Sequence, residues 1–189
     1  MIYFTSDTHF CHDKAFLWGP RGFNNPEDMN AAIIERWNAR VKPDDEVYIL
    51  GDLMLSDSEG GMECLKQLNG TLHVIRGNHD TDKRVELYGT LPNVVEITYA
   101  TVLKYKYEKI GKTLSFYLSH YPTLTANIDK EYLSKAVLNL HGHTHSKEKF
   151  SGSPFMYNVA MDAHDCTPVS IDEICADMVN NIKKKNAVL

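Results

Sequence analysis

The feature that most constrains the fold is the alternation of short apolar runs with helical segments in the first 80 residues. Three runs are rich in β-branched and aromatic residues and predict buried strands, at residues 2–6, 47–50 and 72–75. Between the first and second strands, Asn25 followed by Pro26 predicts the start of a helix that ends near Val41. Between the second and third strands, a shorter helix is expected at about 61–68. Because alternating strands and helices favour parallel pairing through crossover connections, we expect an α/β core.

The second half of the chain predicts more strand than helix. Residues 94–107 and 113–119 are typical of long strands on either side of a turn at Gly111, hence antiparallel. A helix is expected at about 129–137, and a strand at 155–161.

The last segment predicts a helix that closes a single domain. Ser170 and Glu173 form a capping-box pattern in front of a stripe of apolar residues. The sequence contains no obvious linker or internal repeat, so we expect one domain over residues 1–189.

Composition narrows the class of protein. The 189 residues include 20 Lys and Arg against 25 Asp and Glu, a net charge of −5, so no basic surplus supports stable nucleic-acid binding. The longest apolar stretches are well short of the roughly 20 residues that a membrane span needs, and no export signal is visible. The four cysteines lie far apart, which is typical of free intracellular thiols. We therefore expect a cytoplasmic protein.

The functional signal is that potential metal ligands follow directly after the predicted strands. Seven such side chains occur at strand ends: Asp7, His9, Asp52, Asn78, His120, His143 and His145. In open α/β sheets, ligands collect beyond the carboxyl ends of the strands, so these side chains can converge on one site. Residues two apart in an extended segment point the same way, so Asp7 and His9 can bind the same ion.

The donor set favours a pair of metal ions. Two carboxylates, one amide oxygen and four imidazoles are too many ligands for one tetrahedral zinc ion, and no thiolate takes part. Mixed nitrogen and oxygen donors suit divalent first-row ions, so we expect two of them, Mn²⁺ first, with Fe, Zn or Ni as alternatives. Asp52, alone at its strand end, is the expected bridging carboxylate. Two such ions would hold a bridging hydroxide for attack on phosphorus, with His79 as general acid and Asp80 orienting its ring.

These residues resemble the motifs of the calcineurin-like metallophosphoesterase superfamily. The ordered blocks are Asp7-Thr8-His9, Gly51-Asp52, Gly77-Asn78-His79-Asp80, His120 and Gly142-His143-Thr144-His145. The resemblance is to small prokaryotic or phage-type members, and it implies an α/β fold, a four-layer α/β/β/α sandwich with two mixed β-sheets flanked by helices. It also implies two metal sites: Asp7, His9, Asp52 and His145 for the first ion, and Asp52, Asn78, His120 and His143 for the second.

The expected function is therefore a binuclear-metal-dependent phosphoester hydrolase of the phosphodiesterase or nucleotide phosphohydrolase type. Its substrate would be a phosphorylated small molecule or a nucleotide. A protein phosphatase is disfavoured, because that branch of the family carries an arginine shortly after its Gly-Asp, and residues 53–56 contain none. A phosphomonoesterase and a non-catalytic metal-binding module on the same fold are the alternatives.

Three further side chains are candidates for contact with a substrate. Arg21 lies in the loop after the first predicted strand and could contact a phosphate, although a solvated loop arginine is the simpler interpretation. His12 and His164 could also touch substrate, although a histidine near a metal more often forms a hydrogen bond than a ligand bond.

Overall fold

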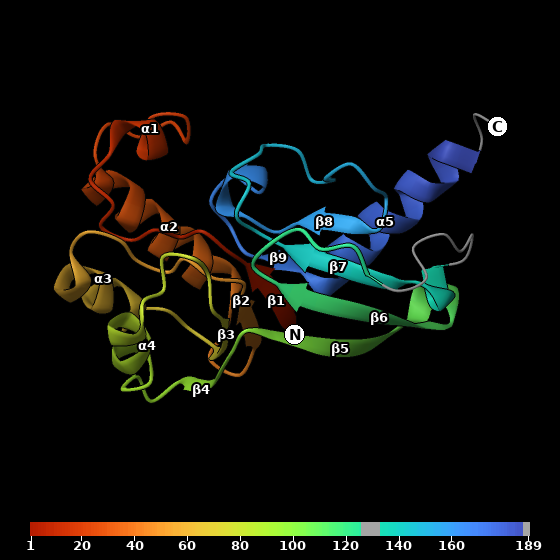
Figure 1. Ribbon diagram of the computed structural model, residues 1–189, viewed down its shortest axis with the longest axis horizontal. Helices are drawn as coiled ribbons and strands as arrows, with labels where there is room; N and C mark the ends of the chain where they lie inside the picture. Colours follow the sequence, from red (N-terminus) through yellow and green to blue (C-terminus); the bar gives the residue numbers. More distant parts are fainter. Residues whose placement is uncertain (126–132, 187–189) are drawn as a thin grey trace.

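The computed structural model describes residues 1–125 and 133–186, the last four of these as backbone alone. Within these ranges the strands form two sheets (Figure 1). The first sheet has the order β4-β3-β2-β1-β9 and consists of β1 (Ile2–Thr5), β2 (Glu46–Ile49), β3 (Thr71–Ile75), β4 (Val94–Thr98) and β9 (Val169–Ser170). Strands β1 to β4 pair in parallel, and β9 is antiparallel to β1, so this sheet is mixed.

The second sheet is also mixed and has the order β5-β6-β7-β8. Its strands are β5 (Ala100–Tyr107), β6 (Lys112–Ser119), β7 (Val137–His141) and β8 (Met156–Asn158). The first two form an antiparallel pair around a turn in which Gly111 is left-handed, with φ of 62°. The remaining pairs are parallel, so the ends of β6 and β7 lie at the same edge.

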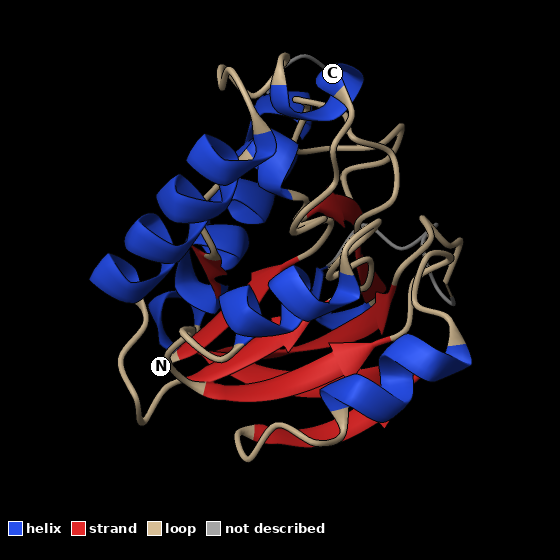
Figure 2. Cartoon of the chain, turned by 90° about the vertical axis from the view of Figure 1, so that its left-hand side faces the viewer, coloured by secondary structure: helices blue, strands red, loops and turns tan. Residues whose placement is uncertain are grey.

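Helices flank the strands, as Figure 2 shows. The α-helices are α1 (Ala15–Trp18), α2 (Pro26–Arg40), α3 (Ser58–Leu65), α4 (Asp82–Tyr88) and α5 (Ile171–Asn186). Single 3₁₀ turns occur at η1 (Glu108–Ile110), η2 (Leu133–Lys135) and η3 (Met161–Ala163). In the part of the chain that the structure describes, no helix is long and apolar enough to cross a bilayer.

Two hydrophobic clusters hold the layers together. In the first, α2 places Ile33 and Trp37 against strand residues of the first sheet such as Val47. In the second, Phe4 of β1 and Phe116 of β6 pack in one cluster, so the two sheets share a core. Burying apolar area at roughly 25 cal/mol per Å² is the main force that fixes these elements relative to one another.

Several predicted elements are confirmed. The side chain of Asn25 accepts a hydrogen bond from the backbone N–H of Asp28, as an N-cap does, and Pro26 is the first residue of α2. The capping box at the last helix also forms. The Glu173 carboxylate accepts hydrogen bonds from the backbone N–H and the hydroxyl of Ser170, and the Ser170 hydroxyl oxygen accepts one from the backbone N–H of Glu173.

Other predicted boundaries were wrong. The helix expected at about 61–68 is α3 at Ser58–Leu65, because the Asp57 carboxylate caps the N–H groups of residues 59 and 60. The expected strand 94–107 is divided between the two sheets, β4 pairing with β3 and β5 with β6. Hydrophobic alternation identifies a strand but carries no information about which sheet it joins.

The segments before and after β7 also differ from expectation. Of the helix expected at 129–137, residues 129–132 lie outside the described residues, while Leu133–Lys135 forms only the 3₁₀ turn η2 and Val137 begins β7. The strand expected at 155–161 is limited to β8. Helix α4 was not predicted at all, although Thr81 caps it through the N–H of Arg84.

Candidate metal centre

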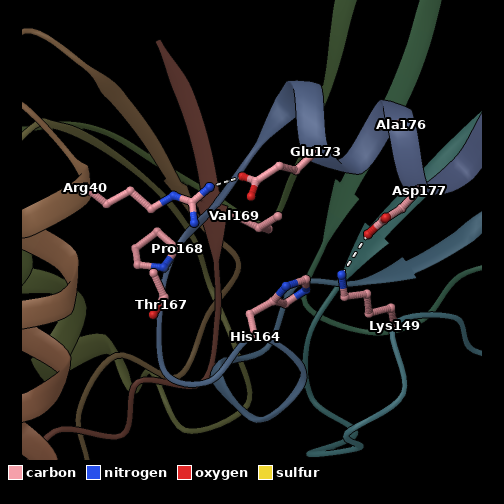
Figure 3. A pocket seen from close by; sticks show the side chains of 9 residues that line it. All are labelled: Arg40, Lys149, His164, Thr167, Pro168, Val169, Glu173, Ala176 and Asp177. Carbon is pink, nitrogen blue, oxygen red and sulfur yellow. Dashed lines mark hydrogen bonds and ion pairs between the residues drawn. The ribbon is translucent and has the colours of Figure 1, made fainter.

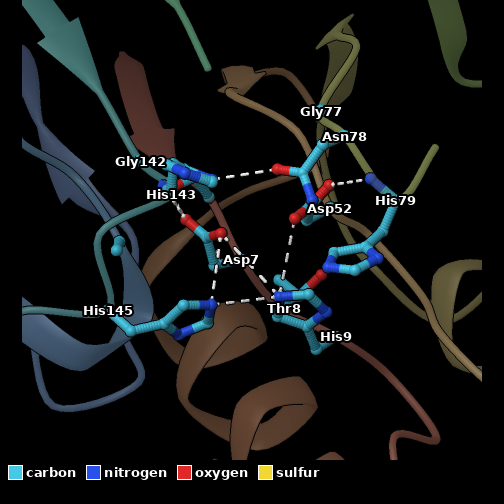
Figure 4. A network of polar contacts seen from close by, with 12 residues as sticks. Asp7, Thr8, His9, Asp52, Gly77, Asn78, His79, Gly142, His143 and His145 are labelled. Atoms are coloured by element: carbon cyan, nitrogen blue, oxygen red, sulfur yellow. Dashed lines mark hydrogen bonds and ion pairs between the residues drawn. The ribbon is translucent and has the colours of Figure 1, made fainter. Parts of the chain in front are cut away.

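The predicted ligands meet where the carboxyl ends of strands from both sheets lie together (Figure 4). Backbone hydrogen bonds hold the loops in register: Asp7 N–H donates to Gly51 C=O at 2.9 Å, and His9 N–H donates to Asp52 C=O at 3.0 Å. The second sheet joins them through His120, whose Nδ1 donates to the Leu50 carbonyl at 2.8 Å. The loops at these strand ends therefore bring together residues that are up to 138 positions apart in sequence.

One group of donors surrounds the carboxylate of Asp7. The Nε2 atoms of His9 and His145 lie 3.2 Å apart, and they are 3.8 and 3.6 Å from the Asp7 Oδ1 atom. These three residues can offer ligand atoms within one coordination sphere. Asp52 Oδ2 lies 3.7 Å from the same His9 nitrogen.

A second group of donors lies on the other side of Asp52. Its Oδ2 atom is 3.5 Å from His120 Nε2. The side-chain oxygen of Asn78 is 2.8 Å from that nitrogen and 2.9 Å from His143 Nδ1. Asp52 Oδ2 therefore lies near both His9 and His120, and Asp7 can offer a ligand atom together with either group.

The chemistry of these donors fits a cation. Asp7 is fully buried, and within the described part of the chain no hydrogen-bond donor reaches its Oδ1 atom. A buried carboxylate oxygen left in this way is costly unless a cation satisfies it. Burial, together with the neighbouring charges of His145 and Arg21, lowers the pKa of His9 to about 2. Its ring is therefore neutral near pH 7, as a metal ligand must be.

A further shell of hydrogen bonds orients the predicted ligands. Ser6 Oγ and His143 N–H donate to Asp7 Oδ2 at 2.6 and 2.9 Å, which leaves Oδ1 turned toward the donors. His145 Nδ1 donates to Asp162 Oδ2 at 3.0 Å, so its Nε2 lone pair faces Asp7. Carboxylates that orient ligand histidines in this way raise the affinity of a metal site.

The sequence did not predict a role for Asp162. Its pairing with Arg21 corrects the interpretation of that arginine. The Arg21 guanidinium is buried, with a side chain 1% exposed, and donates to both Asp162 oxygens at 3.0 and 2.7 Å. It also donates to the backbone carbonyl of Asp7 at 2.7 Å. Arg21 is thus neither a solvated loop residue nor free to grip phosphate. The one sequence signal for Asp162 was its position after a predicted strand.

Asp80 is a second correction. Its carboxylate is buried and accepts from the backbone N–H groups of Asp52 and Gly77 at 2.8 Å each, and from the Tyr88 hydroxyl at 2.8 Å. These partners are the two ligand loops and helix α4, and the His79 ring is not among them. Asp80 therefore locks together the two loops that carry Asp52 and Asn78.

His79 lies beside the predicted metal ligands. Its ring centroid is 5.5 Å from that of His9. Its backbone is held at both ends, because its N–H donates to Asp52 Oδ1 at 2.8 Å and its carbonyl accepts from Arg84 at 2.6 Å. The side chain is half-buried and faces a cavity of about 480 Å³ that is also lined by His12.

The backbone of the ligand loops is unusual. Five of the seven predicted ligands have positive φ: Asp7 at 56°, His9 at 48°, Asp52 at 57°, His143 at 68° and His145 at 49°. Non-glycine residues in this region cost of order 1–3 kcal/mol each and persist where the surroundings enforce them, most often at functional sites. Glycine is required beside them, since a Cβ on Gly51 would lie 2.6 Å from the Gly77 Cα.

A second cavity, of about 210 Å³, lies beside α5 (Figure 3). Its charged side chains pair with each other: Arg40 with Glu173, and Lys149 with Asp177 at 2.9 Å. The charges of its wall are therefore balanced, whereas those of the metal centre are not.

Comparison with known proteins agrees with this geometry. A family model described as the calcineurin-like phosphoesterase superfamily domain matches residues 1–156. The chain belongs to this superfamily. An uncharacterized protein of Methanocaldococcus jannaschii is 34% identical over 181 residues, which cover 92% of this chain and 88% of that protein. The Gene 66 protein of Mycobacterium phage D29 is 29% identical, with 97% of this chain and 98% of the phage protein covered.

Among solved structures, a protein of unknown function from Aquifex aeolicus is similar in fold. Its TM-score is 0.67 at 24% identity, with 93% of this chain and 98% of that chain covered. The predicted family and the predicted α/β fold of two mixed sheets flanked by helices are confirmed. Membership of the superfamily supports hydrolysis of a phosphoester as the general chemistry and divalent metals as the general cofactor.

Proposed function

We propose that this chain is a binuclear-metal-dependent phosphodiesterase or nucleotide phosphohydrolase. The observation that carries the proposal is the convergence of carboxylate and imidazole donors on the buried Asp7, whose Oδ1 has no hydrogen-bond partner among the described residues. The proposal keeps the predicted ligand sets: Asp7, His9, Asp52 and His145 for one ion, and Asp52, Asn78, His120 and His143 for the other. Two divalent ions bound there would supply an acidified water as nucleophile and neutralise charge on the phosphoryl oxygens.

In this proposal His79 gives a proton to the departing ester oxygen. Two observations support the role: its side chain lines the cavity beside the donors, and its backbone is fixed by Asp52 and Arg84. A half-buried imidazole that is not needed as a ligand is free to exchange its proton. His12 lines the same cavity but packs against His9, with ring centroids 5.4 Å apart. Burial lowers the pKa of His12, so less of its ring carries a proton near pH 7.

The lining of the cavity favours a diester over a phosphomonoester or a phosphoprotein. Among the described residues that line it there is no lysine or arginine. A diester has one negative charge where a monoester has up to two, so it depends less on side-chain cations. The Arg21 guanidinium pairs with Asp162 and is therefore not available to contact a bound phosphate.

The test is hydrolysis of bis-p-nitrophenyl phosphate with added Mn²⁺. We expect a chelator to abolish turnover, and His79→Ala to reduce kcat by about 10²- to 10⁴-fold while both metals remain bound. The matched control is His73→Ala, because His73 pairs with Glu46 and Glu96 on the first sheet, away from the cavity. If the protein takes up two metal ions and shows no turnover of any mono- or diester, the non-catalytic metal-binding module is the correct alternative.

A further inference from the structure

Part of the lining of the cavity beside the predicted metal ligands is apolar. It is formed by Phe16 and Leu17 of α1 together with Pro20 and Leu55. Figure 1 shows α1 as a short helix close to α2, at the border of the molecule. An apolar wall next to a polar reaction centre is the usual plan of a small-molecule site, in which the wall binds the part of the ligand that does not react.

Phe16 is the part of this wall with an exposed aromatic ring. Its side chain is 73% exposed, whereas the adjacent Leu17 is only 5% exposed and anchors α1 in the first core. Exposed apolar side chains that stand alone are common on protein surfaces. Phe16 differs from these because it lines the same cavity as His79 and the metal ligands.

The Phe16 ring is linked to the predicted metal ligands through one other ring. It packs edge-on against His12, with ring centroids 5.6 Å apart and planes at 87°. His12 in turn packs against His9, so a continuous row of rings runs from the predicted ligands to Phe16. Because Phe16 is 73% exposed, its ring also has surface that a ligand in the cavity can cover.

We propose that Phe16 is a specificity-determining residue that stacks on a planar aromatic ring carried by the phosphoester. This inference rests on the proposed function, and it names the substrate class as aryl or nucleoside phosphoesters. Aromatic rings prefer offset stacking on another ring over contact with an aliphatic group of similar area. Stacking of one base on an aromatic side chain corresponds to about 10- to 100-fold in affinity.

The test compares ligands that differ only in the ring. We would titrate the Mn²⁺-loaded protein by calorimetry with two pairs of singly charged diester analogues: methyl(phenyl)phosphinate against dimethylphosphinate, and the P-methyl methylene-phosphinate analogues of adenosine 5′-phosphate and ribose 5-phosphate. Their C–P bonds resist hydrolysis, so binding is measured whether or not the protein turns over an ester. A preference in the first pair indicates an aryl group next to phosphorus, and a preference in the second indicates a base held further away.

We expect the ring-bearing ligand of at least one pair to bind about tenfold more tightly or better. Phe16→Ala should bring that ratio close to one, while Phe16→Trp should preserve it. Val95→Ala is the matched control, because Val95 is an apolar side chain on β4 that is 58% exposed and lies outside the cavity.

The inference is overturned if neither pair shows a ring preference, if no ligand binds, or if the preference survives in Phe16→Ala. This failure is distinct from failure of the proposed function. The latter would appear as an absence of Mn²⁺-dependent hydrolysis of bis-p-nitrophenyl phosphate by the unaltered protein.

Discussion

Asp162→Ala is the substitution that most directly tests how the metal centre is held. Asp162 accepts from His145 at 3.0 Å and from two nitrogens of Arg21 at 3.0 and 2.7 Å. Burial alone would raise the pKa of Asp162, but the hydrogen bonds from His145 and Arg21 lower it strongly. The carboxylate is therefore charged in the folded protein throughout the physiological pH range.

The loss of folding stability expected for Asp162→Ala follows from the burial of the Arg21–Asp162 pair. The side chains of Arg21 and Asp162 are only 1% and 8% exposed, so water cannot replace the lost partner of the guanidinium. Breaking a buried ion pair from one side costs about 3–5 kcal/mol, against about 0–1 kcal/mol for an exposed pair. Because His145 also loses its orienting acceptor, we expect Mn²⁺ affinity to fall about 10- to 100-fold. If the proposed pair of ions binds, the loss should fall mainly on the ion that His145 holds.

Two measurements separate these effects. Urea unfolding in the presence of a chelator gives the change in the free energy of unfolding, and calorimetric titration with Mn²⁺ gives the two affinities. Glu63→Gln is the control, because Glu63 pairs with Lys66 where both side chains are more than half exposed, and the expected change is below about 0.5 kcal/mol. If Asp162→Ala does not fold, Asp162→Asn preserves the shape and removes the charge.

A destabilisation below about 1 kcal/mol would contradict this expectation, since the Arg21–Asp162 pair would then behave as a surface pair. Unchanged affinity at both Mn²⁺ sites would also contradict it, because His145 would then need no orienting carboxylate.

Two further predictions concern the first turn of helix α5 and the loop that carries His143. Burial alone would raise the pKa of Glu173, but hydrogen bonds, with that from Arg40 the largest contribution, lower it from 4.5 to about 2. The charged Glu173 therefore stabilises the folded protein above pH 4.5, and this stabilisation is lost as the pH falls toward 2. Glu173→Gln should flatten the stability profile in that window, as urea midpoints measured at several pH values will show. At Gly142 a Cβ would collide with Asp7 Oδ2, so Gly142→Ala should cost about 1–3 kcal/mol and lower Mn²⁺ uptake, whereas Gly89→Ala meets only ordinary contacts. Equal effects of the two glycine substitutions on uptake would contradict this.

Local sequence patterns predicted the features that depend on a few neighbouring residues. Asn25 caps α2 and Ser170 caps α5 because each side chain binds an N–H three residues away. The apolar runs predicted β1, β2 and β3 to within one residue at each end. These features are determined by residues adjacent in the chain, so the sequence alone is sufficient for them.

Only the tertiary structure decided the features that depend on partners distant in sequence. Residues 100–107 could join either sheet as far as their pattern shows, and pairing with β6 decides the matter. The roles of Arg21 and Asp80 follow from partners up to 141 residues away, in particular Asp162. A charged side chain has many possible partners, and burial against one of them, which exists only in the folded chain, selects its role.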